Sequence, residues 1–151
     1  MKILWLLLVG LLSCTQAPRG APANSSSYVQ ATSISSHSFT VLVRAPANHP
    51  LFLENCNGAI NWGLTKFPAP TEQFDWLVMR DACLSSPIKI EPGSSRSFVL
   101  TTPNSGESAP TPGQYHLVLV GVFSSWAGDR PLDQPQVAQA RLISNAVSVG
   151  P

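Results

Sequence analysis

Histidine is the side chain most often used for catalysis and zinc binding near neutral pH. The sequence contains three histidines, His37, His49 and His116. Zinc sites usually draw two histidines from one short motif such as HxH or HExxH, which places both rings on one face of a strand or helix. No such spacing occurs here. We therefore predict no metal site, and we interpret His116, which alternates with Tyr115 in an apolar segment, as an ordinary strand residue.

Nucleophiles and paired carboxylates are the next candidates for chemistry. Serine is abundant, but the sequence has no GxSxG motif and no glycine-rich phosphate loop with its lysine. Glu72 with Asp75, and Asp129 with Asp133, have spacings that acid and base catalysis can use, although such pairs are usually surface charges. We predict a protein that is not an enzyme and binds no cofactor. The alternative is an enzyme whose catalytic residues converge from distant segments.

Cys14 stands at an abrupt change of composition. Lys2 is followed by the apolar run 3–12, whereas residues 15–27 contain no large apolar side chain. One positive charge before a short apolar run is typical of an export signal. The run is shorter than the roughly 20 residues that a membrane-spanning helix needs.

The segment Leu11-Leu12-Ser13-Cys14 resembles the lipobox of bacterial lipoproteins. In that family the signal is cut before the cysteine, whose sulfur then carries a diacylglycerol. The resemblance implies a signal peptide at 1–13, a lipid on Cys14 that attaches the chain to a membrane of the cell envelope, and a flexible linker at 14–27. Thr15, where an Asp would favour the inner membrane, favours the outer membrane if the organism has one. The alternative is an ordinary signal peptide with a cysteine there by chance.

If Cys14 is acylated, two cysteines remain in the exported part of the chain. Cys56 and Cys83 are then expected to form one disulfide, because exported domains are oxidised. The sequence has no CxxC pair, so we expect this bridge to be structural rather than redox-active.

The charge balance excludes one class of partner. Removal of residues 1–13 removes one of the nine basic residues, which leaves eight Lys and Arg against eight Asp and Glu. A near-neutral chain without a basic cluster lacks the positive surface that nucleic-acid binding requires. We predict a protein partner in the envelope and no nucleic acid.

The remaining residues, 28–151, form one domain in which short apolar alternations are separated by turn signals, which is typical of an all-β fold. The strongest strand signal is 114–124, where Tyr115, Leu117, Leu119 and Phe123 share one face. Only 71–74 and 137–142 have sequences compatible with a helix. The predicted strands are 38–44, 51–56, 60–67, 74–83, 88–91, 94–102, 114–124 and 140–149.

This domain resembles the immunoglobulin-like modules of bacterial envelope proteins. The resemblance lies in Cys56 and Cys83, in Trp76 just before the second cysteine, in the turn "IEPGSS" and in the segment "PGQYHLVL". It implies a β-sandwich of about seven to eight strands, with Tyr115 as a tyrosine corner whose hydroxyl fixes a strand end.

Trp126 and Arg130 are the candidate partner-binding residues. Both lie in the polar segment 126–136, which we predict to be a long loop, and Trp and Arg are the side chains enriched where binding energy is concentrated. In the alternative, Trp126 folds back and covers one end of the sandwich.

Two functional hypotheses follow besides the enzyme. The first is a non-enzymatic envelope lipoprotein that serves as an interaction module or an accessory subunit of a membrane-associated complex. The second is a proteinase inhibitor that inserts an exposed loop, either 101–113 or 126–135, into its target, because small bacterial sandwich domains of similar design include such inhibitors. The prolines of both loops would reduce the entropy lost on binding.

Overall fold

A computed structural model describes residues 28–68, 73–78, 83–106, 108–128, 130–132, 137 and 142–151. The predictions for the signal peptide, for Cys14 and for the linker 14–27 lie outside these residues, as does most of the two segments with helix-compatible sequence. The described residues form twelve strands and no helix, which confirms the all-β prediction. Eight strands have five to seven residues, and four are shorter.

The first sheet contains β1 (Val29–Ser35), β2 (Ser38–Arg44) and β7 (Ser95–Thr101) in the order β1-β2-β7, with both neighbouring pairs antiparallel. The alternation predicted for 38–44 is observed, because Phe39, Val41 and Val43 are fully buried while the residues between them are half-exposed. Strand β1 was not assigned from the sequence. Only Val29 and Ala31 are buried in it, so its alternation is too short to identify a strand.

The second sheet has the order β12-β8-β4-β5 and is also antiparallel. Its strands are β4 (Trp62–Lys66), β5 (Trp76–Val78), β8 (Gly113–Leu119) and β12 (Ile143–Val149). Of the strand predicted at 74–83, the described residues 76–78 form β5, residues 74, 75 and 83 are not in a strand, and 79–82 lie outside the described residues. In β12 the register shifts between Ile143 and Ala146, and Ser144 becomes buried in place of Ile143. A bulge moves the side chains before it to the other face, so Ile143 does not share the buried face of Val147 and Val149.

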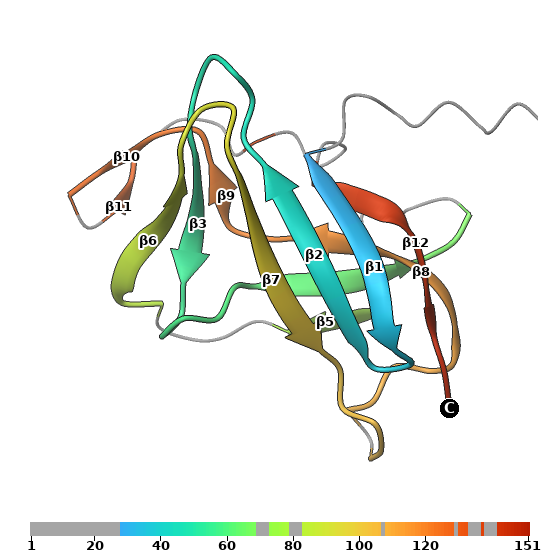
Figure 1. Ribbon diagram of the computed structural model, residues 1–151. Helices are drawn as coiled ribbons and strands as arrows, with labels where there is room; N and C mark the ends of the chain where they lie inside the picture. Colours follow the sequence, from blue (N-terminus) through green and yellow to red (C-terminus); the bar gives the residue numbers. More distant parts are fainter. Residues whose placement is uncertain are drawn as a thin grey trace, which may run out of the picture.

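The third sheet shows where the prediction of one strand over 114–124 was wrong. Gly121 adopts a left-handed conformation, with φ of 68°, and the chain leaves the second sheet there. After this turn β9 (Val122–Phe123) pairs with β3 (Leu51–Asn55), which also pairs with β6 (Ser85–Ile90). A strong apolar run thus contributes to two different sheets. Figure 1 shows β3, β6 and β9 grouped to one side of β7.

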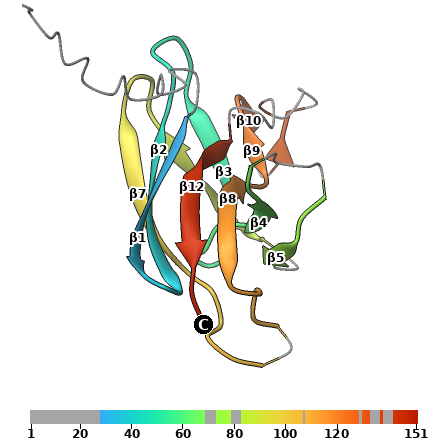
Figure 2. The same cartoon turned by 90° about the vertical axis from the view of Figure 1, so that its right-hand side faces the viewer.

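The three sheets share one core. In Figure 2 the sheet of β1, β2 and β7 faces the sheet of β12, β8, β4 and β5. The rings of Phe39 and Trp62 meet edge to face between them, with centroids 6.4 Å apart. The largest fully buried side chains come from all three sheets and are Tyr115, Phe39, Leu51, Leu53, Leu64, Leu117 and Leu119.

Two links predicted from the sequence are present. Cys56 and Cys83 form a disulfide across 27 residues. The Tyr115 hydroxyl, in a side chain only 1% exposed, donates to the carbonyl oxygen of Thr111 at 2.7 Å. This contact fixes the start of β8 in the way that a tyrosine corner does.

Candidate functional site: an open groove beside β7

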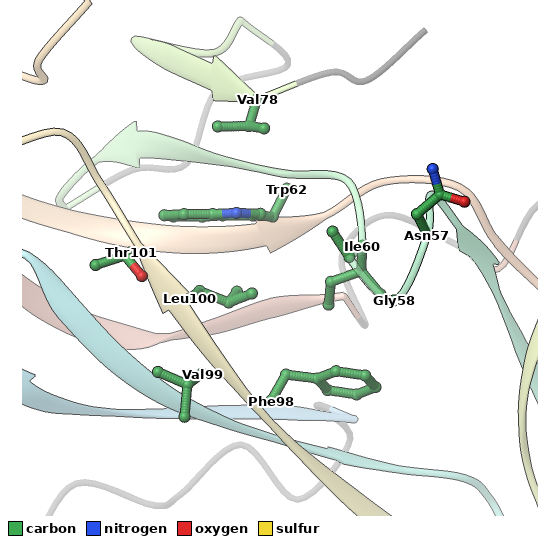
Figure 3. Close-up of a pocket in the computed structure, with 10 residues that line it drawn as sticks. Asn57, Gly58, Ile60, Trp62, Val78, Phe98, Val99, Leu100 and Thr101 are labelled. Carbon is green, nitrogen blue, oxygen red and sulfur yellow. The ribbon is translucent and has the colours of Figure 1, made fainter. Parts of the chain in front are cut away.

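A groove of about 510 Å³ lies beside β7, between the edges of the first two sheets. Strand β7 forms one side, and β4, β5 and the turn before β4 form the rest. Figure 3 shows Val78 on one side of the Trp62 ring and Leu100 on the other. The volume is within the range of about 300–1,000 Å³ that is usual for ligand pockets. The lining residues are Asn57, Gly58, Ala59, Ile60, Trp62, Val78, Phe98, Val99, Leu100 and Thr101.

The floor of the groove is rigid because its side chains belong to the core. Ile60, Trp62 and Leu100 are only 3%, 3% and 6% exposed. The Trp62 ring is held on its other sides by Phe39 and by Trp76, whose ring centroid is 4.9 Å away. Trp76 is fixed in turn by a hydrogen bond of 2.6 Å from its indole nitrogen to the carbonyl of Ser108. A guest would therefore meet a preformed surface.

Among the described residues, β7 is the last strand at one edge of its sheet, and its pairing with β2 shows which backbone groups face outward. The hydrogen bonds from the Ala45 nitrogen to the Ser94 carbonyl and from the Thr102 nitrogen to the His37 carbonyl mark the pairs that bond to β2. Such pairs recur at every second residue in an antiparallel ladder. The N–H and C=O groups of Ser97, Val99 and Thr101 therefore point away from β2. No described residue donates a hydrogen bond to these C=O groups or accepts one from these N–H groups.

The opposite edge of the same sheet is closed. The side-chain amide of Asn145, in β12, accepts from the Ala31 nitrogen at 2.8 Å and donates to the Ala31 carbonyl at 2.9 Å. One side chain thus satisfies both outward backbone groups of a β1 residue. Proteins usually protect free edges against unwanted pairing with charge, proline or a bulge. Of the three outward-facing residues of β7 named above, none is charged or a proline, and Val99 is 67% exposed.

The charge near the groove is asymmetric. None of the lining residues is charged, but Arg96 is exposed and its guanidinium lies 5.7 Å from the centroid of the Phe98 ring. The ion pairs among the described residues are Lys66 with Asp75 and Lys89 with Glu91, so Arg96 has no carboxylate partner there. Phe98, which lines the groove, is therefore next to a cation that has no carboxylate partner among the described residues.

Trp126 and Arg130 lie elsewhere, in a short hairpin of β10 (Trp126–Ala127) and β11 (Arg130–Pro131) rather than in the predicted loop. Trp126 is half-buried and packs against Phe52 and Phe123, with ring centroids 6.4 Å and 5.7 Å away. Its indole nitrogen is buried and has no hydrogen-bond partner within the described part of the chain. This is the packing that the alternative interpretation of Trp126 expected, whereas the Arg130 side chain is exposed.

The three histidines do not come together in a site. His37 contacts Thr102 and the carbonyl of Pro151, His49 contacts the Pro50 carbonyl, and His116 contacts the Ser144 carbonyl. Within the described ranges no group of three or more His, Cys, Asp or Glu side chains is arranged to hold a metal ion.

No family model, curated protein or solved structure matches this chain. No helix long and apolar enough to cross a membrane occurs among the described residues.

The sequence did not point to this groove. Residues 94–102 were predicted as a strand, but nothing in them shows that the strand lies at an edge. The one unusual residue is Val99, which is apolar although it shares its face of the strand with the polar residues Ser97 and Thr101.

Proposed function

We propose that this chain is a non-enzymatic lipoprotein of the cell envelope whose β-domain binds another protein. The observation that carries the proposal is the edge of β7, whose outward backbone groups have no partner among the described residues, beside a preformed groove with Trp62 and Leu100 at its floor. A row of unpaired backbone groups beside the exposed Val99 side chain is a template on which another extended chain can pair.

The domain is proposed to be an immunoglobulin-like sandwich. Support comes from the two facing antiparallel sheets, from the hydroxyl bond of Tyr115 to Thr111 and from the disulfide between Cys56 and Cys83. Sandwich domains of this kind commonly act as recognition modules, although the fold by itself does not identify a function.

The lipid on Cys14 and the location in the envelope are part of the same proposal. They are supported by the lipobox-like residues 11–14 and by a disulfide that requires an oxidising compartment. Intact-mass analysis of the membrane fraction should find a chain that begins at Cys14 and carries acyl groups. The variant Cys14→Ser should leave that fraction, and an unmodified Cys14 thiol in the wild-type chain would contradict the anchor.

Co-purification tests the binding function directly. The chain should be cross-linked in intact cells, extracted from membranes with detergent, and isolated together with whatever is attached. We expect one dominant protein to be recovered in a constant ratio. A chain that is always recovered alone after cross-linking would refute the interaction module.

A proteinase inhibitor is the second candidate, and the loop after β7 favours it. Residues 103–106 are exposed, while the loop is held before them by the bond from the Thr102 nitrogen to the His37 carbonyl and after them by the Trp76 bond to Ser108. An exposed loop with fixed ends is what an inhibitor needs in order to resist cleavage. The purified chain should be assayed against serine, cysteine and metallo-proteinases, and cleavage of this loop without inhibition would refute the candidate.

A further inference from the structure

We infer that the groove receives an extended segment of the partner protein, which pairs with β7 as a fourth strand of the first sheet and places a carboxylate opposite Arg96. This inference rests on the proposed function as an interaction module and adds the chemistry of the partner. It follows from the positions of the free backbone groups, the apolar floor and the unpaired cation described above.

The backbone determines the conformation of the guest. Ser97, Val99 and Thr101 present N–H and C=O groups in a row along the edge. Only a second extended chain offers a matching row of donors and acceptors, which is the basis of recognition by strand addition. An antiparallel guest would form three pairs of hydrogen bonds, one pair with each of these residues.

The side chains determine the sequence of the guest. Arg96, Phe98 and Leu100 alternate with the three outward-bonding residues and share the face of β7 that carries the buried Leu100, although Arg96 itself is exposed. These positions become non-hydrogen-bonded pairs with the new strand, so the facing side chains approach closely. Apolar residues of the guest would lie opposite Leu100 and Phe98 and enter the groove, and the next alternate residue would face Arg96. Read from its N-terminus, an antiparallel guest has the pattern apolar-x-apolar-x-acidic.

Charge also separates this guest from two other occupants. A second copy could offer its own β7, but Ser95–Thr101 contains no acidic residue. The N-terminal segment of the same chain contains no Asp or Glu anywhere in residues 1–27. Either occupant would leave Arg96 without a carboxylate, whereas a different protein with an acidic residue at this position would pair with it.

The direct test is hydrogen exchange of the full lipidated chain in detergent with a defined peptide. The probe is the heptapeptide Thr-Val-Thr-Val-Thr-Glu-Thr, which has the required pattern. We expect the segment that contains Ser95–Thr101 to gain protection, with exchange at least tenfold slower, while β1 is unchanged because Asn145 already covers it. Absence of protection in β7 at millimolar peptide would overturn the inference.

A proline at position 99 provides the decisive variant. The Val99 nitrogen does not bond to β2, so Val99→Pro removes only an outward donor and should fold, as proline does on edge strands. Val99→Ala is the matched control, because it shortens the same side chain but keeps the N–H group. We expect Val99→Pro to lower peptide binding at least tenfold and Val99→Ala to lower it less than threefold. Equal binding by the two variants would refute strand addition.

A charge exchange tests the role of Arg96. With Arg96→Glu the preference should reverse, so that a peptide with Lys in place of Glu binds better than the original. Exposed ion pairs contribute about 0.2–1 kcal/mol, and the expected change in preference is therefore about 1.4- to fivefold in each direction. An unchanged preference would remove the carboxylate from the proposal.

Two further outcomes separate this inference from the proposed function. If cross-linking recovers the same partner with Val99→Pro as with the wild type, the interaction module stands and the β7 site is wrong. If protection of β7 increases with protein concentration in the absence of peptide, the edge belongs to a second copy and the inference is again wrong. Recovery of no partner by the wild type refutes the proposed function itself, independently of the peptide result.

Discussion

Removal of the disulfide should produce a large change in stability whose size follows from a simple physical model. The bridge between Cys56 and Cys83 closes a loop with a sequence separation of 27 residues. In the chain-entropy model, opening such a loop increases the conformational entropy of the unfolded state, which lowers the free energy of unfolding by about 3.5 kcal/mol at 25 °C. The double variant Cys56→Ala/Cys83→Ala should therefore unfold about 3.5 kcal/mol more easily than the wild type.

Packing around the sulfurs makes this value a lower estimate. Cys56 is only 6% exposed, and the amide nitrogen of the buried Asn61 lies 3.7 Å from the Cys83 sulfur. The same nitrogen also donates to Glu54 at 3.3 Å, so Asn61 keeps one partner when the sulfur is removed. The additional loss should therefore come from the small cavity and not from an unsatisfied buried amide.

Urea unfolding of the full chain in detergent, followed by tryptophan fluorescence, measures the effect. With a denaturant slope of about 2 kcal/mol/M, the midpoint should fall by about 1.7 M. Treatment of the wild type with a reductant is the control, because it should reproduce the shift while leaving the double variant unchanged. A double variant within about 1 kcal/mol of the wild type, or a fully reduced wild type with an unchanged midpoint, would refute the reasoning.

Three further changes test the packing. Tyr115→Phe removes a hydroxyl that donates at 2.7 Å and should lower the free energy of unfolding by about 1–2 kcal/mol in urea. Gly63→Ala would place a methyl carbon 2.8 Å from the Trp76 carbonyl oxygen, and we expect a loss of about 1–3 kcal/mol, with a lower thermal midpoint in circular dichroism. Trp126→Ala should lower stability by about 2 kcal/mol, since the ring covers two phenylalanines, whereas the exposed Arg130→Ala should change it by less than about 0.5 kcal/mol.

Each of these changes has an outcome that contradicts it. A Tyr115→Phe chain as stable as the wild type would show that the hydroxyl bond contributes nothing beyond its exchange with water. A Gly63→Ala chain of unchanged stability would show that β5 can move away from β4. Loss of partner binding by Trp126→Ala without loss of stability would contradict the packing role and support the partner-binding role predicted for Trp126.

The sequence by itself determined the fold class and most of the strands. Alternation of apolar residues identified strands at 38–44 and 114–119. Successive side chains of a strand point to opposite faces, so a strand with one buried face has an apolar residue at every second position of its sequence. The disulfide and the hydroxyl contact of Tyr115 could also be predicted. The cysteines were the two that remained after the proposed lipid attachment, and the tyrosine lies beside a recognisable turn.

Only the tertiary structure decided which strands are neighbours, and this determines where the groove lies. Nothing in the apolar run 114–124 indicates that the chain turns at Gly121 and that Val122 and Phe123 join a third sheet. The periodicity of a strand shows which side chains share a face, but not which strand pairs with it. The sequence also does not distinguish the two edge strands β7 and β1. In β1 the backbone of Ala31 bonds to the side chain of Asn145, which lies 114 positions further along the chain, whereas no described residue bonds to the outward backbone groups of β7. Exposure of a backbone edge depends on which segments fold against it, and that is a property of long-range contacts rather than of local residue order.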